Sequence, residues 1–175
     1  MNIQAVQLIP FKVTSDARGS LSEVFRSAGT GKTIEQWNCI RSRANVLRGM
    51  HTHLLYDELY VPVAGHMFFM LKDARASSPT FQAEQSFFLD DQARTSVWVP
   101  RGVAHGVYFE TAGVLLYGLS AGWRDAQEYG FRWNDSSVKA AWPAARPVLS
   151  ERDANAASFK DMLAAMASDL APAAQ

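Results

Sequence analysis

Short apolar segments separated by turn motifs are the feature that most constrains the fold of this chain. Each segment is rich in aromatic and β-branched residues, which favour β-strands. Turn-forming sequences such as DARG, AGTGK, SSPT and TAG separate the segments. Many short strands at regular spacing are typical of a β-sandwich or a β-barrel. The sequence predicts strands at residues 4–13, 20–26, 34–42, 56–65, 66–73, 85–90, 95–100, 105–110 and 113–120.

One segment near the end of the chain predicts a helix instead. The apolar side chains of residues 158–170 recur at helical spacing. Ser158 is suited to cap the start of this helix, because Asp161 follows three residues later. Residues 128–153, between the strands and the helix, show no strong periodicity, and we expect an irregular connector there.

The charge balance and the cysteine content narrow the classes of function. The 175 residues include 17 basic and 17 acidic side chains, so the formal net charge is zero. General nucleic-acid binding is not expected, because it needs a basic excess. Cys39 is the single cysteine, so no intramolecular disulfide forms. No apolar run approaches the ~20 residues of a membrane span. The N-terminus does not resemble a signal peptide, and we expect a cytoplasmic protein with no membrane partner.

Three of the four histidines lie in two distinctive motifs. The first motif, RGMHTHLLYDELYVPVAG, contains His51, His53 and Glu58, and the second, VPRGVAHGV, contains His105. If His51 and His53 lie on a strand, their spacing of two residues places both side chains on the same face. A lone histidine is often structural, but two ordered motifs favour a functional site.

The two motifs resemble the paired motifs of the cupin superfamily, H-x-H with a following E and G, and P-x-G-x-x-H. The resemblance implies a mostly β fold, a jelly-roll (double-stranded β-helix) barrel with a C-terminal helix. We expect a single domain over residues 1–175, with the barrel at about 20–125 and the irregular segment and helix at 126–170. The resemblance also implies four candidate ligands for zinc, manganese, iron or nickel: His51, His53, Glu58 and His105.

A longer resemblance covers residues 16–153. Eight segments occur in the order and rough spacing of the dTDP-4-dehydrorhamnose 3,5-epimerases, which are themselves cupins. These segments are DARGSLSEVF, EQWNCIRSRANVLRGMH, KDARASSPTF, VPRGVAHGV, LLYG, EYGFRWND, AAWP and LSERD. The chain is therefore similar to that family over most of its length, and the resemblance implies a nucleotide-sugar substrate.

The chemistry of that family explains the residue types. In a 4-keto-6-deoxy sugar, the C–H bonds at C3 and C5 are acidic because they lie beside the carbonyl group. A base removes a proton and an acid returns one to the opposite face, so the two groups must flank the ring. The resemblance implies that His51 is the base, that Asp153 orients and stabilises its imidazole, and that Tyr117 is the acid. We expect an epimerase acting at C3, C5 or both, in polysaccharide precursor synthesis.

The resemblance also assigns substrate-binding positions. Arginines among them suit a nucleotide diphosphate, because a guanidinium matches phosphate oxygens. No cofactor is expected to be required, with a divalent metal as an alternative, and the family resemblance implies a homodimer. The substrate-binding positions are Arg18, Glu23, Gln36, Asn38, Arg48, His105, Glu128 and Arg152.

Three residues depart from the family pattern. His53 stands where the family usually has glutamine, and Glu58 where it has a lysine thought to stabilise the enolate oxygen. Trp123 replaces a second tyrosine near the sugar. A metal held by His53 and Glu58 would supply the positive charge that lysine gives elsewhere. Three alternatives stay open: a nucleotide-sugar 3,4-ketoisomerase, a metal-dependent cupin using the four candidate ligands, and a non-catalytic sugar-binding cupin.

Overall fold

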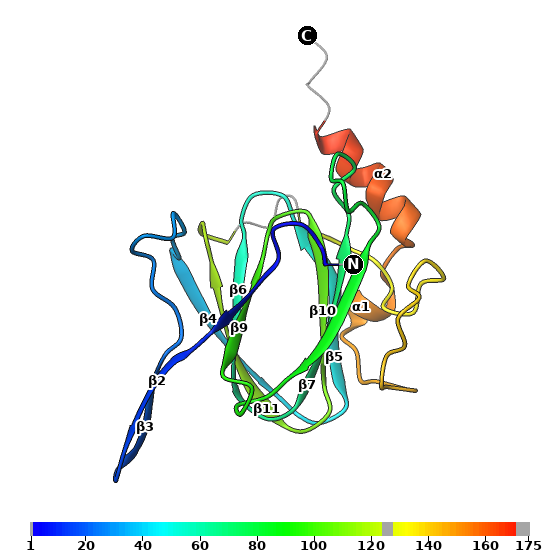
Figure 1. The fold of residues 1–175 in the computed structure, drawn as a ribbon. Coiled ribbons are helices and arrows are strands. Elements are labelled where there is room, and N and C mark those ends of the chain that lie inside the picture. The colour runs from blue at the N-terminus through cyan, green and yellow to red at the C-terminus, as the bar shows by residue number, and fades with distance from the viewer. Residues whose placement is uncertain (1, 124–127, 171–175) are drawn as a thin grey trace.

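The computed structural model describes residues 2–123 and 128–170, and its centre consists of two antiparallel sheets that face each other (Figure 1). The first sheet has the strand order β1 (Gln7–Pro10), β9 (Thr95–Val99), β6 (Glu58–Ala64), β11 (Gly113–Leu119) and β4 (Gln36–Ser42). The second has the order β12 (Glu128–Gly130), β5 (Val46–His53), β10 (Val103–Phe109), β7 (Met67–Asp73) and β8 (Glu84–Leu89). The predicted mostly β fold class is confirmed.

An apolar core fills much of the space between the two sheets. Phe69 and Leu71 of β7, Val107 and Phe109 of β10, and Leu115 of β11 are among its members. Strand β4 alternates between exposed and partly buried residues over most of its length, as expected when only one face is covered. Strands β7 and β10 are instead buried at every position. The second sheet is therefore covered on both faces.

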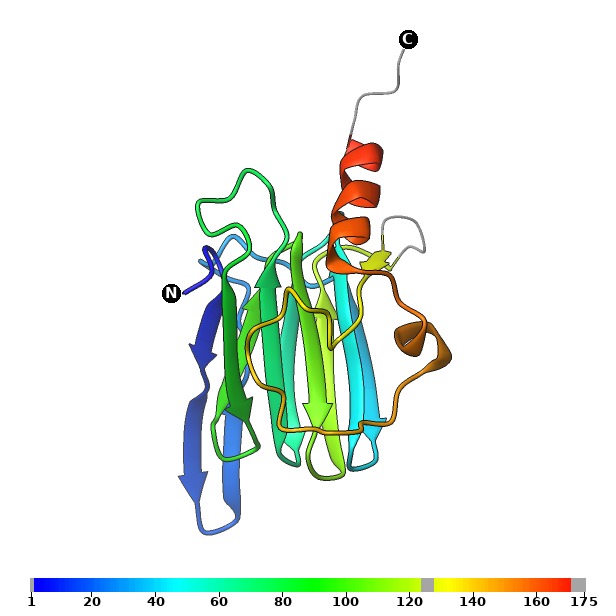
Figure 2. The same ribbon diagram turned by 90° about the vertical axis from the view of Figure 1, so that its right-hand side faces the viewer.

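The C-terminal part of the chain covers the outer face of the second sheet (Figure 2). Helix α2 (Phe159–Leu170) packs Phe159, Met162 and Met166 into the core on this side. The predicted helix over 158–170 is confirmed, and Ser158 Oγ accepts the N–H of Asp161 at 3.1 Å as a cap. Neither helix of the described chain has the length and apolar character that a membrane crossing requires.

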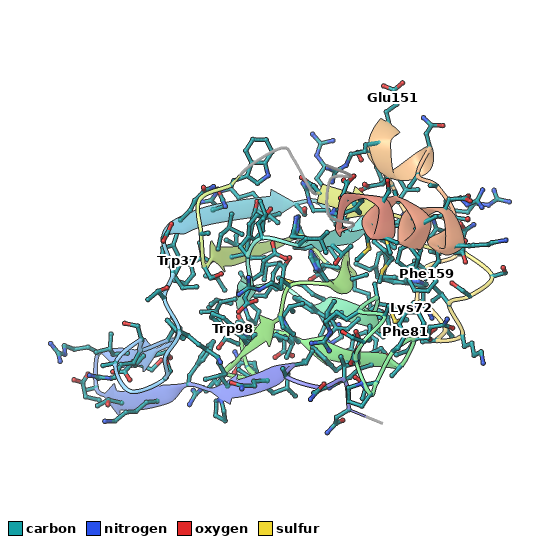
Figure 3. The ribbon with its side chains drawn as sticks, turned by 90° about the horizontal axis from the view of Figure 1, so that it is seen from above. Trp37, Lys72, Phe81, Trp98, Glu151 and Phe159 are labelled. Carbon is teal, nitrogen blue, oxygen red and sulfur yellow. The ribbon has the colours of Figure 1, made fainter. Side chains whose placement is uncertain are left out.

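A buried lysine fastens this covering segment to the sheet. Lys72 of β7 donates to the carbonyl of Ser137 at 2.9 Å and to Glu84 Oε1 at 2.8 Å. Its ammonium group also lies 4.9 Å from the ring centre of Phe159, and both residues are labelled in Figure 3. Because an unpaired buried charge is costly, these contacts favour one fixed position of the segment.

The first predicted strand, 4–13, is divided in the structure. Strand β1 ends at Pro10, and β2 (Lys12–Asp16) pairs with β3 (Gly19–Glu23) in a hairpin that projects from the sandwich (Figure 1). Proline lacks the N–H that a continuing ladder needs, so it suits the end of an edge strand. Leu21 on this hairpin is 76% exposed.

Three further elements differ from the sequence-based expectation. Strand β5 carries the first histidine motif, yet its segment is missing from the predicted strands. The segment 128–153, expected to be irregular, begins with β12 and ends in the short helix α1 (Glu151–Ala154), whereas residues 131–150 between them form no helix or strand, as expected. Strand β1 belongs to the first sheet and β12 to the second. The two sheets therefore include residues outside the expected barrel limits of 20–125.

Candidate active site

A cavity of about 580 Å³ opens between the two sheets, a size typical of small-molecule sites. The second sheet contributes His51 and His53 from β5 and His105 from β10. The first sheet contributes Glu58 from β6 and Tyr117 from β11. The sequence motifs that are far apart in the chain therefore meet in one place.

His51 and Asp153 form a hydrogen-bonded pair at one wall of the cavity. His51 Nε2 lies 2.7 Å from Asp153 Oδ1, and the N–H of Gly49 reaches Asp153 Oδ2 at 3.4 Å. Asp153 is held by α1, whose N-cap residue Ser150 accepts the N–H of Asp153. Gly130 of β12 is the cross-strand partner of His51 of β5 in the antiparallel pair. A Cβ atom at Gly130 would meet the carbonyl of Met50 at 2.9 Å, so only glycine allows this approach.

The surroundings keep Asp153 ionised. Burial favours the neutral acid, but the hydrogen bond and charge of His51, the N–H of Gly49 and the charge of Arg152 together lower the pKa of Asp153 below its usual value. An ionised carboxylate orients the imidazole and stabilises the imidazolium form. The pair is therefore suited to proton abstraction.

Arg152 and Glu128 form an ion pair beside the same imidazole. Arg152 Nη1 lies 2.6 Å from Glu128 Oε1, and Arg152 Nη2 lies 2.7 Å from His51 Nε2. Burial raises the pKa of Glu128, but Arg152 outweighs that effect and lowers it below the usual value. Arg48 lines the cavity nearby and donates from Nε to Ser42 Oγ at 3.1 Å. Among the described residues, two guanidinium groups thus border the cavity.

Tyr117 lies on the first sheet, whereas His51 lies on the second. Its ring stacks on Tyr60 with ring centres 5.9 Å apart. Burial, together with the negative charges of Glu58 and Glu128, raises the pKa of Tyr117. The phenol therefore keeps its proton at neutral pH and can donate it into the cavity.

A second group of titratable side chains, His53, Glu58 and His105, is buried deeper. Glu58 Oε2 lies 3.1 Å from His105 Nε2 and 3.6 Å from His53 Nε2. Burial raises the pKa of Glu58. Burial also lowers the pKa of His53 to about 4 and that of His105 to about 3. Both imidazoles are therefore neutral near pH 7.

The expected set of four metal ligands is not brought together as predicted. Within the described residues, candidate ligand atoms of His53, Glu58 and His105 lie within 4.8 Å of one another, and His51 is not part of that group. The ring centre of His51 is 6.4 Å from that of His105, and its imidazole is engaged by Asp153 and Arg152. His51 shares the cavity with the group but is excluded from its ligand set.

Four predicted substrate-binding residues are not among those that line this cavity, although Asn38 is the cross-strand partner of Tyr117, which does line it. Arg18 pairs with Asp16 on the projecting hairpin, and Glu23 pairs with Arg26. Gln36 of β4 accepts the N–H of Trp123 at 2.9 Å and donates to Asn38 at 3.1 Å. Trp123 itself lines the cavity.

Two tyrosines that line the cavity, Tyr56 and Tyr60, were missed by the sequence analysis. The hydroxyl oxygen of Tyr56 lies 2.8 Å from His53 Nδ1. The hydroxyl of Tyr60 donates to Glu58 Oε2 at 3.0 Å. Tyr60 follows Glu58 by two residues on one strand, so alternation alone places both side chains on one face. Tyr56 precedes β6 in a loop, where no such periodicity applies.

Comparisons with known proteins found a matching family and similar solved structures. A family model described as dTDP-4-dehydrorhamnose 3,5-epimerase matches residues 1–161. A dTDP-4-dehydrorhamnose 3,5-epimerase from Mycobacterium tuberculosis is 38% identical over 144 residues, which cover 78% of this chain and 71% of that protein.

Two solved structures are similar over nearly the whole chain. An epimerase from Legionella pneumophila, in complex with dTDP-4-keto-L-rhamnose, has a TM-score of 0.87 and 27% identity, covering 95% of this chain and 94% of its own. A 3'-monoepimerase from Streptomyces bikiniensis, in complex with dTDP-quinovose, has a TM-score of 0.84 and 28% identity, covering 97% and 89%.

Proposed function

The chain belongs to the dTDP-4-dehydrorhamnose 3,5-epimerase family, and we propose that it is an epimerase that exchanges and returns protons at C3, C5 or both carbons of a dTDP-4-keto-6-deoxy sugar. Relatives described as 3,5-epimerases and as a 3'-monoepimerase support this range of outcomes. The proposed chemistry uses side chains alone for proton transfer.

His51 is the proposed base. Its imidazole removes the proton from the carbon beside the carbonyl group, and the electron pair of the C–H bond moves to the carbonyl oxygen to give an enolate. The carboxylate of Asp153, 2.7 Å from His51 Nε2, stabilises the imidazolium that forms. Asp153 therefore acts through His51 as a positioning residue.

Tyr117 is the proposed acid. Its phenol returns a proton to the opposite face of the same carbon, and the double bond of the enolate reverts to the carbonyl group. The raised pKa keeps the phenol protonated until that step. The placement of His51 and Tyr117 on opposite sheets of one cavity is the observation that carries the proposal.

The nucleotide is proposed to bind where the basic side chains border the cavity. Arg48 and Arg152 suit the diphosphate, because each presents several N–H donors to phosphate oxygens. Glu128 holds Arg152 at 2.6 Å, so the guanidinium is partly oriented before substrate arrives. His105, predicted to bind substrate, lines the same cavity.

We also propose a homodimer, because Arg18 and Glu23 lie on a hairpin that projects away from the sandwich (Figure 1). Such a hairpin exposes Leu21 and its own strand edges, which a second copy would cover. The hairpin of one copy would then bring Arg18 and Glu23 to the cavity of the other, where the family resemblance expects them.

The test is solvent exchange with dTDP-4-keto-6-deoxy sugars in deuterium oxide. We expect deuterium at C3, C5 or both, located by NMR and counted by mass spectrometry. His51→Asn and Tyr117→Phe should abolish epimerised product while the circular dichroism spectrum stays that of the wild type. His66→Asn and Tyr108→Phe are matched controls, because neither residue lines the cavity.

The same experiment separates the alternatives. A 3,4-ketoisomerase would yield a product whose carbonyl group has moved to C3. A non-catalytic sugar-binding protein would bind the nucleotide sugar without any deuterium uptake. Either result, across several nucleotide-linked 4-keto sugars, would overturn the proposal.

A further inference from the structure

Arg152 lies directly against the imidazole that is proposed to act as the base. Its Nη2 atom is 2.7 Å from His51 Nε2 and 3.3 Å from His51 Nδ1, so one guanidinium nitrogen reaches both ring nitrogens. The role proposed above for Arg152, contact with the diphosphate of the substrate, does not account for this second contact. The contact therefore points to a further role of Arg152 in the proton transfer itself.

The contact of Arg152 with His51 conflicts with the pairing between His51 and Asp153. A guanidinium carries only N–H donors, so a short contact with a ring nitrogen requires a lone pair on that nitrogen. An ionised carboxylate only accepts, so Asp153 Oδ1, which is 2.7 Å from the same Nε2, requires an N–H there instead. His51 Nε2 cannot meet both requirements at once. One of the two neighbours must therefore withdraw before His51 can work together with Asp153.

Arg152 is the neighbour that is free to withdraw. Its side chain is 60% exposed, whereas that of Asp153 is 5% exposed and accepts the N–H of Gly49. The ion pair of Arg152 with Glu128 uses Nη1, and the contact with His51 uses Nη2. Because the two contacts use different atoms, Arg152 can keep its ion pair while Nη2 turns from His51 to another acceptor.

The diphosphate of a nucleotide sugar is the acceptor that the cavity is suited to bring there. Arg48, Arg152 and His51 line the same cavity. Phosphate oxygens carry negative charge, so they accept from a guanidinium more strongly than a neutral imidazole nitrogen does. We propose that Arg152 holds His51 inactive until the diphosphate of the substrate withdraws it, so that the nucleotide activates the base as well as anchoring the sugar. This inference rests on the proposed function, in which His51 is the base and Arg152 binds the diphosphate.

Withdrawal of Arg152 sets His51 in the state that proton abstraction needs. Nε2 then donates to Asp153, and the lone pair on Nδ1 is free to accept a proton. The proton moves from the sugar carbon to Nδ1, and the electron pair of the C–H bond moves to the carbonyl oxygen, as in the proposed epimerisation. A keto sugar without a diphosphate would instead meet a base whose nitrogens are both in contact with Arg152. The site would therefore select nucleotide sugars at the chemical step as well as in binding.

The test separates the nucleotide from the sugar. The 1,5-anhydro analogue of a 4-keto-6-deoxy sugar has no substituent at C1, so it leaves room for a phosphate group beside it. The analogue is incubated with the full chain in deuterium oxide, with and without dTDP at a concentration that calorimetry shows to be saturating. NMR measures deuterium at C3 and C5. We expect dTDP to accelerate this exchange about tenfold, the factor that corresponds to one hydrogen bond to a charged group.

Arg152→Ala should remove the need for dTDP. We expect this variant to exchange the analogue at the accelerated rate without dTDP, and dTDP should add nothing. Arg132→Ala is the matched control, because Arg132 is also exposed but does not line the cavity, and it should respond to dTDP as the wild type does. Circular dichroism establishes that both variants are folded.

A second measurement follows His51 without any reaction. In protein labelled with ¹⁵N-histidine, NMR reports which ring nitrogen carries the proton, and His51→Asn identifies the signals of His51. We expect dTDP to shift these signals in the wild type to those of the tautomer with its proton on Nε2. In Arg152→Ala the signals should have these positions without dTDP. A His51 signal that ignores dTDP in the wild type would overturn the proposed withdrawal.

Failure of this inference and failure of the proposed function give different results. Wild-type exchange of the analogue that is equally fast with and without dTDP would overturn the inference, while epimerisation of an intact dTDP sugar would still stand. Exchange in Arg152→Ala that is no faster than in the wild type without dTDP would also overturn it. Absence of exchange in every sample, intact dTDP sugars included, would overturn the proposed function. A His51 signal that responds to dTDP in the wild type alone would then still support the release of His51 by a diphosphate.

Discussion

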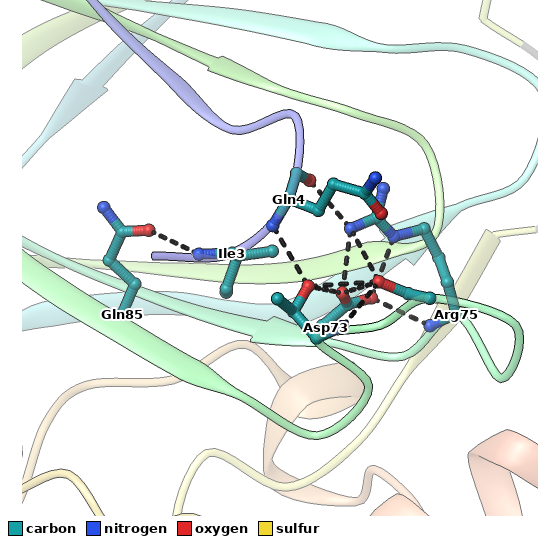
Figure 4. A network of polar contacts seen from close by, with 7 residues as sticks. Ile3, Gln4, Asp73, Arg75 and Gln85 are labelled. Carbon is teal, nitrogen blue, oxygen red and sulfur yellow. Dashed lines mark hydrogen bonds and ion pairs between the residues drawn. The ribbon is translucent and has the colours of Figure 1, made fainter. Parts of the chain in front are cut away.

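Asp73 and Asp153 are both buried aspartates with a lowered pKa, but their surroundings differ. Asp73 is completely buried at the end of β7. It accepts hydrogen bonds from Arg75, Ser78 and Thr80, all within seven residues along the chain (Figure 4). Burial raises the pKa of Asp73, but these donors outweigh burial and lower it to about 2. Arg75 in turn donates to the carbonyl of Gln4, which ties the N-terminal segment to the sandwich.

Asp153 is 5% exposed, and its partner comes from a distant part of the sequence. Its carboxylate holds His51, which lies 102 residues away in the sequence and lines a cavity. Neither burial nor a lowered pKa separates the two aspartates. The difference lies in the partner: the partners of Asp73 contact other parts of the protein, whereas the partner of Asp153 faces the space for a substrate. In this molecule the functional carboxylate is the one whose hydrogen-bond partner lines the cavity.

Between the two aspartates, the larger expected effect on turnover comes from Asp153→Asn. The amide keeps the shape of the side chain but cannot stabilise an imidazolium, so we expect kcat to fall on the order of a thousandfold. KM and the melting temperature should change little. Steady-state kinetics and thermal unfolding measure the two effects, with Asp91→Asn on an exposed loop as the control. A variant that keeps kcat within tenfold of the wild type would make Asp153 a structural residue like Asp73.

Asp73→Asn should have the opposite profile. It removes the charge that Arg75 faces and turns an acceptor of several hydrogen bonds into a partial donor. We expect the free energy of unfolding to fall by about 3 kcal/mol, as when one member of a buried pair is removed. Denaturant titration measures this loss, and kcat per folded molecule should match the wild type. A fall in kcat similar to that of Asp153→Asn would remove the distinction between the two residues.

The same contrast explains how far the sequence could predict the molecule. Local patterns were sufficient for most strands and for α2, because alternation and helical spacing are properties of neighbouring residues. His53 and His105 were expected in one place only because their two motifs resemble the paired motifs of the cupins. The pairing of His51 with Asp153 came only from a family resemblance, because no local pattern connects residues that distant.

Strand β5 shows why a local pattern can also mislead. Polar and glycine residues interrupt the apolar alternation of its sequence, VLRGMHTH. Gly49 is required there because β10 approaches so closely that a Cβ atom would lie 2.5 Å from Gly106 Cα. Gly49 therefore weakens the strand pattern in the sequence, but the close packing of β5 against β10 requires a glycine at that position. The sequence also could not predict that Arg18 and Glu23 lie away from the cavity of their own chain, because their position depends on the direction in which the β2–β3 hairpin projects.

The dependence of stability on pH should sharpen the comparison further. The pKa of Asp73 is lower in the folded chain than in the unfolded one, so its stabilisation is present above the unfolded value of 3.8 and is lost as pH falls through about 2. The stability gap between wild type and Asp73→Asn should therefore narrow by about 1 kcal/mol between about pH 6 and about pH 3. Denaturant titrations at both pH values measure the gap. A gap that stays constant would mean that the carboxylate charge contributes nothing to the network.

The smallest effects should come from the serines that support each aspartate. Ser78 Oγ donates to Asp73 Oδ2 at 2.6 Å, and Thr80 donates to the same oxygen, so Ser78→Ala should cost only about 0.5 kcal/mol of stability. Its kcat should not change. Ser150 Oγ accepts the N–H of Asp153 and caps α1, so Ser150→Ala should cost about 1 kcal/mol and also reduce kcat, because the carboxylate loses its fixed position against His51. If both serine variants affected only stability, the cap of α1 would be independent of catalysis, and the position of Asp153 would depend on His51 and the N–H of Gly49 instead.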